Sequence, residues 1–283
     1  MKLDPTMRIG IIGGRGRTGR QFATLFRNQG FPVMVTDVST KKKNRDLIEQ
    51  CDVVIFAVPL QESVRIMQQN IGYATRKDQL IMDVSSLKEG QVKAMLEGSG
   101  EVLGMHPMFG PKTDPKSQTV ILCPGRVSRA TLQSVRQRLR SMGLKTVTLT
   151  PRQHDRLMAF VQALPHLKSL LIAGALHALH ADLDRVEGVS PPPYEIELDL
   201  VGRFLDDDPA LYGPIMFGNA HSPEIIATLQ KLLTEFAEIG ATQDYSRFGR
   251  YYRTLQRRFG PRLARARARS EACIHTLTFL SRS

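Results

Sequence analysis

The chain has 283 residues, 42% of them hydrophobic and 23% charged, a balance typical of a soluble globular protein with one large or two ordinary domains. The first residues, MKLDPTM, contain no apolar signal segment, and the longest apolar run in the middle of the chain, Leu170 to Leu176, is too short to cross a bilayer. The three cysteines show neither a disulfide framework nor metal-ligand spacing. We expect a cytoplasmic protein that binds no metal and no membrane.

The net charge of +12 raises the question of an anionic partner. The stretch RLARARARS, Arg262 to Ser270, is the strongest basic patch. The other basic residues are spread over the whole chain, without interleaved aromatic residues or a known nucleic-acid motif. We therefore expect no nucleic acid and favour a small anionic substrate, which a positive field would also attract. A non-catalytic regulator that senses a dinucleotide and binds nucleic acid is the alternative.

The first 150 residues alternate short apolar segments with longer amphipathic ones. Near-continuous apolar strands separated by helices indicate a parallel sheet covered on both faces. We expect a helix over Arg129 to Met142. The expected strands are Arg8 to Ile12, Pro32 to Asp37, Asp52 to Val58, Gln79 to Val84, Glu101 to Met105, Thr119 to Gly125 and Leu144 to Thr150.

After Pro151 the pattern becomes helical, and no β-rich segment follows. Pro165 should kink or split the first long helix, and further helices are expected over Pro214 to Leu232 and Phe248 to Phe279. The predicted fold class is α/β: a Rossmann-type, doubly wound, mostly parallel sheet over residues 1–150, followed by an all-helical domain over residues 151–283. The apolar helix faces of the second domain exceed what one small domain can bury, which suggests a homodimer formed through the C-terminal helices.

A glycine motif connects the first strand to the first helix. Gly14, Gly16 and Gly19 form a GxGxxG pattern, and Asp37 ends the second strand. In this context Gly14 allows the tight turn, Gly16 lets the backbone approach a pyrophosphate, and Gly19 permits close helix packing. The motif predicts a dinucleotide cofactor.

The carboxylate of Asp37 favours NAD, because it would accept hydrogen bonds from ribose hydroxyls and repel a 2′-phosphate. NADP is the alternative, since the run Lys41 to Lys43 could neutralise that phosphate, although it reads more simply as a solvated helix start. The residues expected to contact the cofactor are Gly14, Arg15, Gly16, Arg17, Thr18, Gly19, Asp37, Val58, Pro59 and Ser85.

His106 follows the fifth apolar segment in the stretch LGMHPMFGPK. Ligands of open α/β sheets bind beyond the carboxyl ends of the strands, so this histidine belongs to the face where a nicotinamide would lie. Proline fixes φ and removes a backbone donor, so we expect the strand to stop here and the segment Pro107 to Pro111 to hold His106 rigidly.

Five stretches, taken in order and spacing, resemble the prephenate dehydrogenases: GGRGRTG, VSSLKEG, VLGMHPMFGP, QHDRLMAFVQALPH and ELDLVGRFLDDDPALY. The resemblance runs from about Met7 to the C-terminus and is greatest to the dehydrogenase half of the fused chorismate mutase–prephenate dehydrogenases. Few residues precede the first strand, so we expect no mutase half. The resemblance implies NAD-dependent oxidative decarboxylation of an anionic cyclohexadienol, prephenate, to 4-hydroxyphenylpyruvate.

The resemblance also implies roles for individual residues. His106 would accept the hydrogen bond of the substrate hydroxyl, and Arg203 would bind a carboxylate through its planar fork. His154 and Asp155 are typical of the family, and we interpret them as structural. The implied catalytic residues are His106, Ser86 and His166, and the implied substrate-binding residues are Arg203, Lys88, Tyr212 and Glu195.

Glu195 departs from the family pattern, because the fused enzymes carry an arginine eight residues before the position of Arg203. If Glu195 faces the pocket, a substrate with an amine becomes attractive. The alternatives are therefore 4-amino-4-deoxyprephenate, used by related antibiotic-pathway enzymes, and arogenate. An exposed helix position that has drifted is the simpler explanation of the glutamate, and we favour it.

Overall fold

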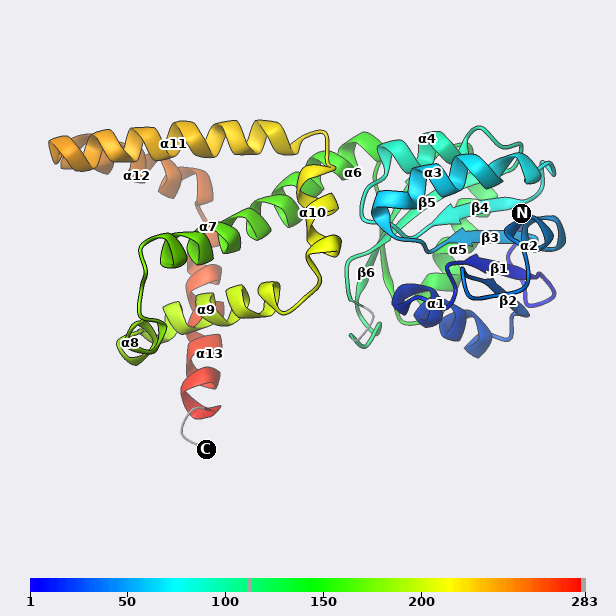
Figure 1. Ribbon diagram of the computed structural model, residues 1–283, viewed down its shortest axis with the longest axis horizontal. Helices are drawn as coiled ribbons and strands as arrows, with labels where there is room; N and C mark the ends of the chain where they lie inside the picture. The colour runs from blue at the N-terminus through cyan, green and yellow to red at the C-terminus, as the bar shows by residue number, and fades with distance from the viewer. Residues whose placement is uncertain (111–112, 281–283) are drawn as a thin grey trace. The chain divides into compact units, whose positions relative to one another are not determined.

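The computed structural model describes residues 1–110 and 113–280, with side chains to residue 276 (Figure 1). Pro111, at the end of the segment expected to hold His106 rigidly, lies outside the described residues. The contacts divide the chain into two compact units. Unit 1 comprises Met1–Val161 and Gly213–His221, and unit 2 comprises Gln162–Tyr212 and Ser222–Ser283. The expected boundary at residue 150 stays a prediction.

Unit 1 is built on one seven-stranded sheet in the order β2-β1-β3-β4-β5-β6-β7. All neighbouring strands are parallel except β5 and β6, which pair antiparallel. The predicted mostly parallel sheet is confirmed. The strands are β1 (Ile9–Ile12), β2 (Val33–Thr36), β3 (Val53–Phe56), β4 (Leu80–Asp83), β5 (Glu101–Pro107), β6 (Thr119–Pro124) and β7 (Lys145–Thr148).

Both faces of this sheet are buried, which explains the continuous apolar strands. Ile9 and Ile11 of β1 belong to one apolar cluster, with side chains of α1 and α5, while Ile12 belongs to a second cluster with side chains of α2, α3 and α4. Alternate residues of one strand thus fill two cores. The helices are α1 (Arg17–Asn28), α2 (Asn44–Gln50), α3 (Leu60–Asn70), the 3₁₀ turn η1 (Ile71–Tyr73), α4 (Glu89–Met95) and α5 (Arg129–Ser141).

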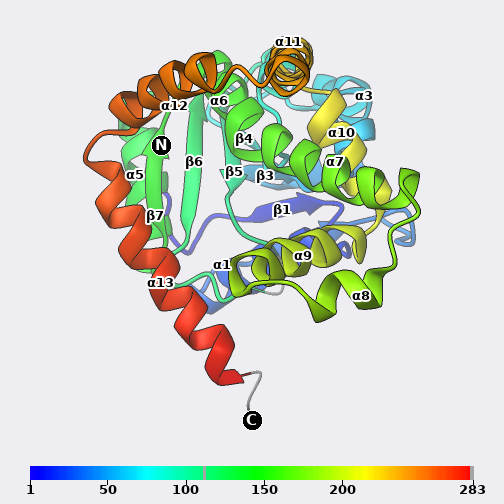
Figure 2. The same cartoon turned by 90° about the vertical axis from the view of Figure 1, so that its left-hand side faces the viewer.

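The chain from residue 151 to 280 is helical throughout, which confirms the predicted all-helical second half. In unit 2, α7 and α9 run side by side, and α13 crosses α9 (Figures 1 and 2). The helices are α6 (Pro151–Met158), the π-helical η2 (Ala159–Ala163), α7 (Leu164–Ala178), α8 (Leu183–Gly188), α9 (Pro192–Leu205), α10 (Pro209–Phe217), α11 (Ser222–Thr242), α12 (Tyr245–Phe259) and α13 (Arg262–Leu280).

The structure corrects three local expectations. Strand β5 does not stop before Pro107, because the proline is its last residue and needs no further ladder donor. The helix expected over 214–232 is interrupted between α10 and α11, after Gly218. The helix expected over 248–279 is interrupted at Gly260, whose φ of +49° is left-handed. Pro165, which was expected to kink or split the first long helix, lies in the first turn of α7, directly after a π-helical segment, and the helix continues without a break from Pro151 to Ala178.

The apolar run Leu170 to Leu176 belongs to a longer element. Pro151–Ala178 is a 28-residue helix that is apolar enough, by length and composition, to cross a membrane, and only 22% of its most apolar window is buried. Core helices of soluble proteins pass the same test. Several of its large apolar side chains, such as Phe160, Val161 and Leu171, are therefore exposed.

Gly104 leaves space on β5 for the side chain of Lys88. A Cβ at this position would lie 2.9 Å from Lys88 Cδ and 3.0 Å from a methyl group of Val92. We expect Gly104→Ala to lower the free energy of unfolding by about 1–3 kcal/mol, the usual cost of overpacking a core. Chemical denaturation would measure this loss. Gly72→Ala is the control, because a Cβ there meets no atom within 4 Å, and an equal loss in both variants would contradict the packing argument.

Candidate active site

The glycine loop lies between β1 and α1, as the motif predicted. Gly13 has a φ of +80°, so Gly13, and not Gly14 as predicted, makes the left-handed turn. A Cβ on Gly14 would lie 2.6 Å from Val35 Cβ, and Gly19 packs against the backbone of Gly13 and Gly14. These glycines bring β1, β2 and the start of α1 close together. The doubled glycine in IIGGRG was the available signal for Gly13.

A cavity of about 720 Å³ opens beside this loop. Of the predicted cofactor residues, its lining contains Arg15, Gly16, Asp37, Val58 and Pro59. Arg17 and Thr18 lie in the first turn of α1, and Ser85 lies beyond β4. The prediction missed several polar lining residues that are not part of the motif, namely Arg20, Asn44, Arg65, Gln69 and Asn70.

Asp37 is held at the end of β2 by the loop itself. The backbone N–H of Arg15 donates to Asp37 Oδ2 at 3.1 Å, and the Arg15 guanidinium donates to Ser39 Oγ at 3.0 Å. The loop and the carboxylate thus form one polar end of the cavity, with donors and an acceptor a few ångströms apart. This arrangement suits an anionic group next to a pair of hydroxyls.

A buried ion pair lies beneath the carboxyl ends of β4 and β5. The Lys88 ammonium is fully buried and pairs with Asp83, which is equally buried, and it also donates to the Met105 carbonyl at 2.9 Å. Lys88 was predicted to bind substrate, but these partners use its charge inside unit 1. The pair instead fixes the backbone immediately before His106.

The Asp155 carboxylate joins two parts of unit 1. Its Oδ1 accepts the N–H of Lys88 at 2.8 Å, and its Oδ2 accepts the N–H of Glu89 at 2.9 Å, at the start of α4. A carboxylate at a helix N-terminus is stabilised by the free donors and by the helix dipole. Asn219 Nδ2 donates to the Asp155 carbonyl at 2.7 Å. Asp155 therefore has little freedom to move.

The same carboxylate begins a chain of hydrogen bonds to His106. Asp155 Oδ1 lies 2.7 Å from His154 Nδ1, and His154 Nε2 lies 2.8 Å from His106 Nδ1. The carboxylate can only accept, so His154 Nδ1 carries a proton and, in the neutral ring, its Nε2 accepts from His106 Nδ1–H. The lone pair of His106 is then on Nε2. The chain of bonds sets His106 as a neutral hydrogen-bond acceptor.

Burial reinforces this state. His106 is only 2% exposed, and desolvation, helped by the charges of His154 and Lys88, holds its pKa well below the usual value. Burial also lowers the pKa of His154, although its bond to Asp155 opposes that effect. Both rings are therefore neutral near pH 7. His154 and Asp155, which we interpreted as structural, thus contact the predicted catalytic residue through hydrogen bonds.

The two serines after β4 differ. Ser85, a predicted cofactor residue, donates its hydroxyl to Asp83 and so belongs to the buried polar cluster. Ser86 is half-buried, and its hydroxyl has no hydrogen-bond partner among the residues that the structure describes. Of the two, Ser86 is the hydroxyl available to a ligand.

Unit 2 holds the other predicted residues. His166 stacks on Phe204, with ring centroids 5.3 Å apart, and contacts Tyr212 at 4.6 Å. Burial lowers the pKa of His166, and the Tyr212 hydroxyl donates to Asp207 at 3.1 Å. Arg203 precedes Phe204 on α9 and is exposed.

Arg203 has no ion-pair partner among the described side chains, so its guanidinium is available to an anion. Glu195 is half-buried in the first turn of the same helix. Eight residues correspond to somewhat more than two helical turns, so Glu195 and Arg203 lie about 12 Å apart along α9, on neighbouring parts of its surface. Whether Glu195 faces a substrate stays a prediction.

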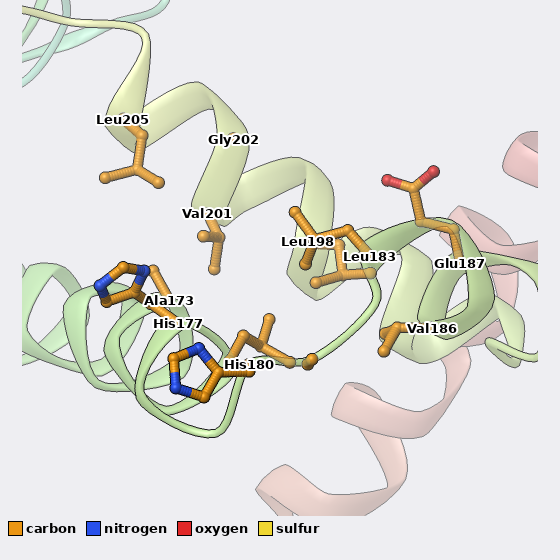
Figure 3. Close-up of a pocket in the computed structure, with 12 residues that line it drawn as sticks. Ala173, His177, His180, Leu183, Val186, Glu187, Leu198, Val201, Gly202 and Leu205 are labelled. Atoms are coloured by element: carbon orange, nitrogen blue, oxygen red, sulfur yellow. The ribbon is translucent and has the colours of Figure 1, made fainter.

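A second cavity, of about 490 Å³, lies within unit 2 between α7, α8 and α9 (Figure 3). Leu198, Val201 and Leu205 of α9 project toward it, and His177 and His180 lie on the opposite side. Its lining is predominantly apolar, and none of the predicted site residues lines it. We assign it no catalytic role.

Residues 22–149 match the model of the prephenate dehydrogenase nucleotide-binding domain, and residues 150–254 match the model of the prephenate dehydrogenase dimerization domain. A probable arogenate/prephenate dehydrogenase of Methanocaldococcus jannaschii is 30% identical over 97% of this chain and 66% of its own length. The T-protein of Enterobacter agglomerans is 30% identical over 83% of this chain and 62% of its own length. The chain thus spans just under two thirds of these curated relatives.

Solved structures share the fold. Prephenate dehydrogenase from Aquifex aeolicus, in complex with hydroxyphenyl propionate and NAD+, superposes with a TM-score of 0.70 at 20% identity and covers 89% of this chain and 96% of its own. Synechocystis arogenate dehydrogenase gives a TM-score of 0.70 at 18% identity, over 90% of this chain and 99% of its own. At these identities the likeness establishes the fold alone.

The buried histidines predict how stability depends on pH. Their pKa values in the folded state lie below the value of about 6.5 in the unfolded chain, so the unfolded chain binds more protons once the pH falls through 6.5. Stability should therefore be complete above this pH and fall below it, by up to about 1.4 kcal/mol per pH unit and histidine.

Denaturation at pH 7.5, 6.5 and 5.5 measures this slope. His106→Asn should flatten it below pH 6.5, because one titrating group is removed. His275→Asn, at an exposed position, is the control and should keep the full slope. The same slope in His106→Asn as in the wild type would contradict a neutral, desolvated His106.

Proposed function

The chain belongs to the prephenate dehydrogenase family, and from this premise we propose that it catalyses the NAD-dependent oxidative decarboxylation of prephenate to 4-hydroxyphenylpyruvate, in tyrosine biosynthesis. The observation that carries the proposal is the hydrogen-bonded series Asp155–His154–His106, at the carboxyl end of β5. It presents a neutral acceptor where the family chemistry needs one. The other features of unit 1 are consistent with this assignment.

The cavity beside the glycine loop fits the cofactor. A dinucleotide needs backbone donors for its pyrophosphate and an acceptor for a ribose, and the start of α1 and Asp37 supply them. The negative charge of Asp37 favours NAD over NADP. Lys43 precedes the first turn of α2, as expected of a solvated helix start. When bound, the nicotinamide supplies the hydride acceptor.

His106 would act at the substrate hydroxyl. The ring carbon that bears this hydroxyl would lose a hydride, the hydroxyl proton would pass to the Nε2 lone pair of His106, and the ring carboxylate would leave as CO₂, so that the ring becomes aromatic. The proton then returns from His106 to the phenolate oxygen of the product. A neutral imidazole with its lone pair fixed on Nε2 is suited to receive that proton. His154 and Asp155 would stabilise the resulting imidazolium through the hydrogen-bond series, and Ser86 would supply a further polar contact.

Arg203 would bind a substrate carboxylate. It is exposed, its planar guanidinium can make two parallel bonds to a carboxylate, and it lies next to the aromatic cluster of His166, Phe204 and Tyr212. In this cluster the rings provide an apolar surface, and His166 and Tyr212 add polar atoms to it. Such a surface suits a substrate ring that carries polar groups.

Arogenate is the second candidate substrate. The Methanocaldococcus jannaschii relative is described for both arogenate and prephenate, and arogenate differs from prephenate by an amine in its side chain. Glu195 is the residue that would favour such an amine, in arogenate or in 4-amino-4-deoxyprephenate. Prephenate stays the leading candidate, because Glu195 lies two helical turns, about 12 Å, from Arg203 along α9.

We assign the exposed apolar surface of unit 2 to a homodimer. Residues 150–254 match a dimerization domain, and large apolar side chains of α7, α11 and α12 are exposed, among them Leu171, Leu233 and Phe248. A second copy of the chain would cover them. Burial in a dimer would explain why the helix Pro151–Ala178 is so apolar, with no need for a membrane. The three cysteines are free thiols, as expected in a reducing compartment, so we assign the proposed enzyme to the cytoplasm. We expect no nucleic-acid partner.

Absorbance of NADH, followed side by side with prephenate, arogenate and 4-amino-4-deoxyprephenate, tests the function. We expect prephenate to be turned over fastest, and with NAD faster than with NADP. Much slower turnover of prephenate than of an amino substrate would make the substrate assignment wrong. Cofactor binding without any turnover, together with salt-sensitive retention on DNA, would favour the regulator instead.

The same assay with His106→Asn tests the proposed base. Loss of one acid–base group should lower kcat by about 10²–10⁴-fold, while the affinity for NAD stays within a factor of two or so. His275→Asn is the matched control at an exposed position and should keep the wild-type rate. Unchanged activity in His106→Asn would remove the residue from its proposed role.

A further inference from the structure

The C-terminal part of unit 2 carries a strongly basic segment that the proposed reaction does not use. Residues 247–269, in α12 and α13, contain nine arginines and no aspartate, glutamate or lysine. We call them the basic arm. The dimerization-domain match ends at residue 254, so most of the arm lies beyond it. Arg247 pairs with Glu235 and Glu238, whereas the arginines of α13 are exposed.

On α13 the arginines are arranged by face. Arg262, Arg265 and Arg269 are spaced three and four residues apart, so they share one face of the helix, which we call the basic stripe. Arg267 lies on another face. Between these arginines the sequence has Ala264, Ala266 and Ala268, and no charge of opposite sign separates the members of the stripe.

The same unit carries the complementary charge. Residues 182–208 contain nine aspartates and glutamates against two arginines, a net charge of −7. Glu195, Asp199 and Asp206 are spaced four and seven residues apart and form an acidic stripe along α9. The cavity between α7, α8 and α9 takes Leu198, Val201 and Leu205 from α9 (Figure 3). The acidic stripe therefore lies on the side of α9 next to the one that lines the cavity.

The two stripes are close in the fold but not joined. Helix α13 crosses α9 within unit 2 (Figures 1 and 2). Among the side chains described, up to residue 276, no ion pair or hydrogen bond connects an arginine of the basic stripe to a carboxylate of α9. Asp199, Asp206 and the three arginines are exposed. Both stripes are thus accessible in a single chain.

We propose that the basic stripe of one chain docks on the acidic stripe of a second copy, so that the homodimer proposed above is oriented by two equivalent electrostatic contacts. In a dimer with a twofold axis, each copy contributes one basic stripe and one acidic stripe. The basic stripe of each copy then pairs with the acidic stripe of the other, so the contact occurs twice. A polyanion such as nucleic acid fits less well, because the acidic segment beside α13 would repel it. Exposed ion pairs are individually weak and salt-sensitive, so they act on partner orientation more than on total affinity.

Mixing two charge-reversed full-length chains tests this contact directly. The first chain is Arg262→Glu/Arg265→Glu/Arg269→Glu, and the second is Asp199→Lys/Asp206→Lys, which leaves Glu195 intact. If the contact joins two copies, each variant repels itself. A mixed dimer instead has one native contact and one contact in which all stripe charges but that of Glu195 are reversed, and both contacts are attractive. Native mass spectrometry of differently tagged chains, mixed at low ionic strength, counts the mixed dimers.

Random pairing would make half of all dimers mixed. At low ionic strength we expect the mixed fraction to rise to about nine tenths, because a few exposed ion pairs supply a bias of this size. At 1 M salt these pairs are screened, and the mixed fraction should return toward one half. The matched control is Arg257→Glu/Arg258→Glu/Arg267→Glu. It changes the net charge by the same amount but leaves the basic stripe intact, so it should form mixed dimers with the second chain in the statistical proportion. Circular dichroism of each chain checks its folding.

Statistical mixing of the two folded variants would overturn the proposal, because it would mean that the stripes meet within one chain or bind another anion. Wild-type chains that stay monomeric at low salt would overturn it as well. Neither readout uses turnover, so failure of the docking contact is distinguishable from failure of the proposed enzyme activity.

Discussion

The Asp155 carboxylate is the constraint on which the candidate site depends. Its two oxygens bind the first donors of α4 and a ring nitrogen of His154, and its backbone carbonyl is held by Asn219. One charged group thereby fixes the start of a helix and the protonation pattern of two histidines. Replacing the carboxylate by an amide would leave one acceptor oxygen for the two helix donors and the His154 ring, and would free both rings to change tautomer.

The buried ion pair of Lys88 and Asp83 is a second constraint on the position of His106. Asp83 and Gly104 are register partners on β4 and β5, and the missing side chain of Gly104 leaves space for the aliphatic part of Lys88. The ammonium then reaches the carbonyl of Met105, directly before His106. Burying such a pair is costly unless every donor is used. The pair therefore holds the backbone before His106, and a role of Lys88 in binding substrate stays a prediction.

The sheet and the cofactor loop could be predicted because their signals are local. Continuous β-branched strands such as Val53–Phe56 and a glycine motif followed by a helix depend on neighbours in sequence. The breaks after Gly218 and at Gly260 were not predicted, since glycine is also tolerated within apolar helices. The role of Asp155 could not be predicted either, because its partners Lys88 and Glu89 lie more than 60 residues away. The resemblance marked His154 and Asp155, but only the contacts show what they do.

The central claim is that Asp155, acting through His154, holds His106 neutral with its lone pair on Nε2. Nitrogen-15 NMR of histidine-labelled protein at pH 7 measures this most directly, since protonated and unprotonated ring nitrogens have well-separated shifts. The account predicts protonated Nδ1 and unprotonated Nε2 for both His106 and His154, and loss of this pattern in Asp155→Asn. An imidazolium, or a proton on Nε2 of His106 in the wild-type protein, would contradict it.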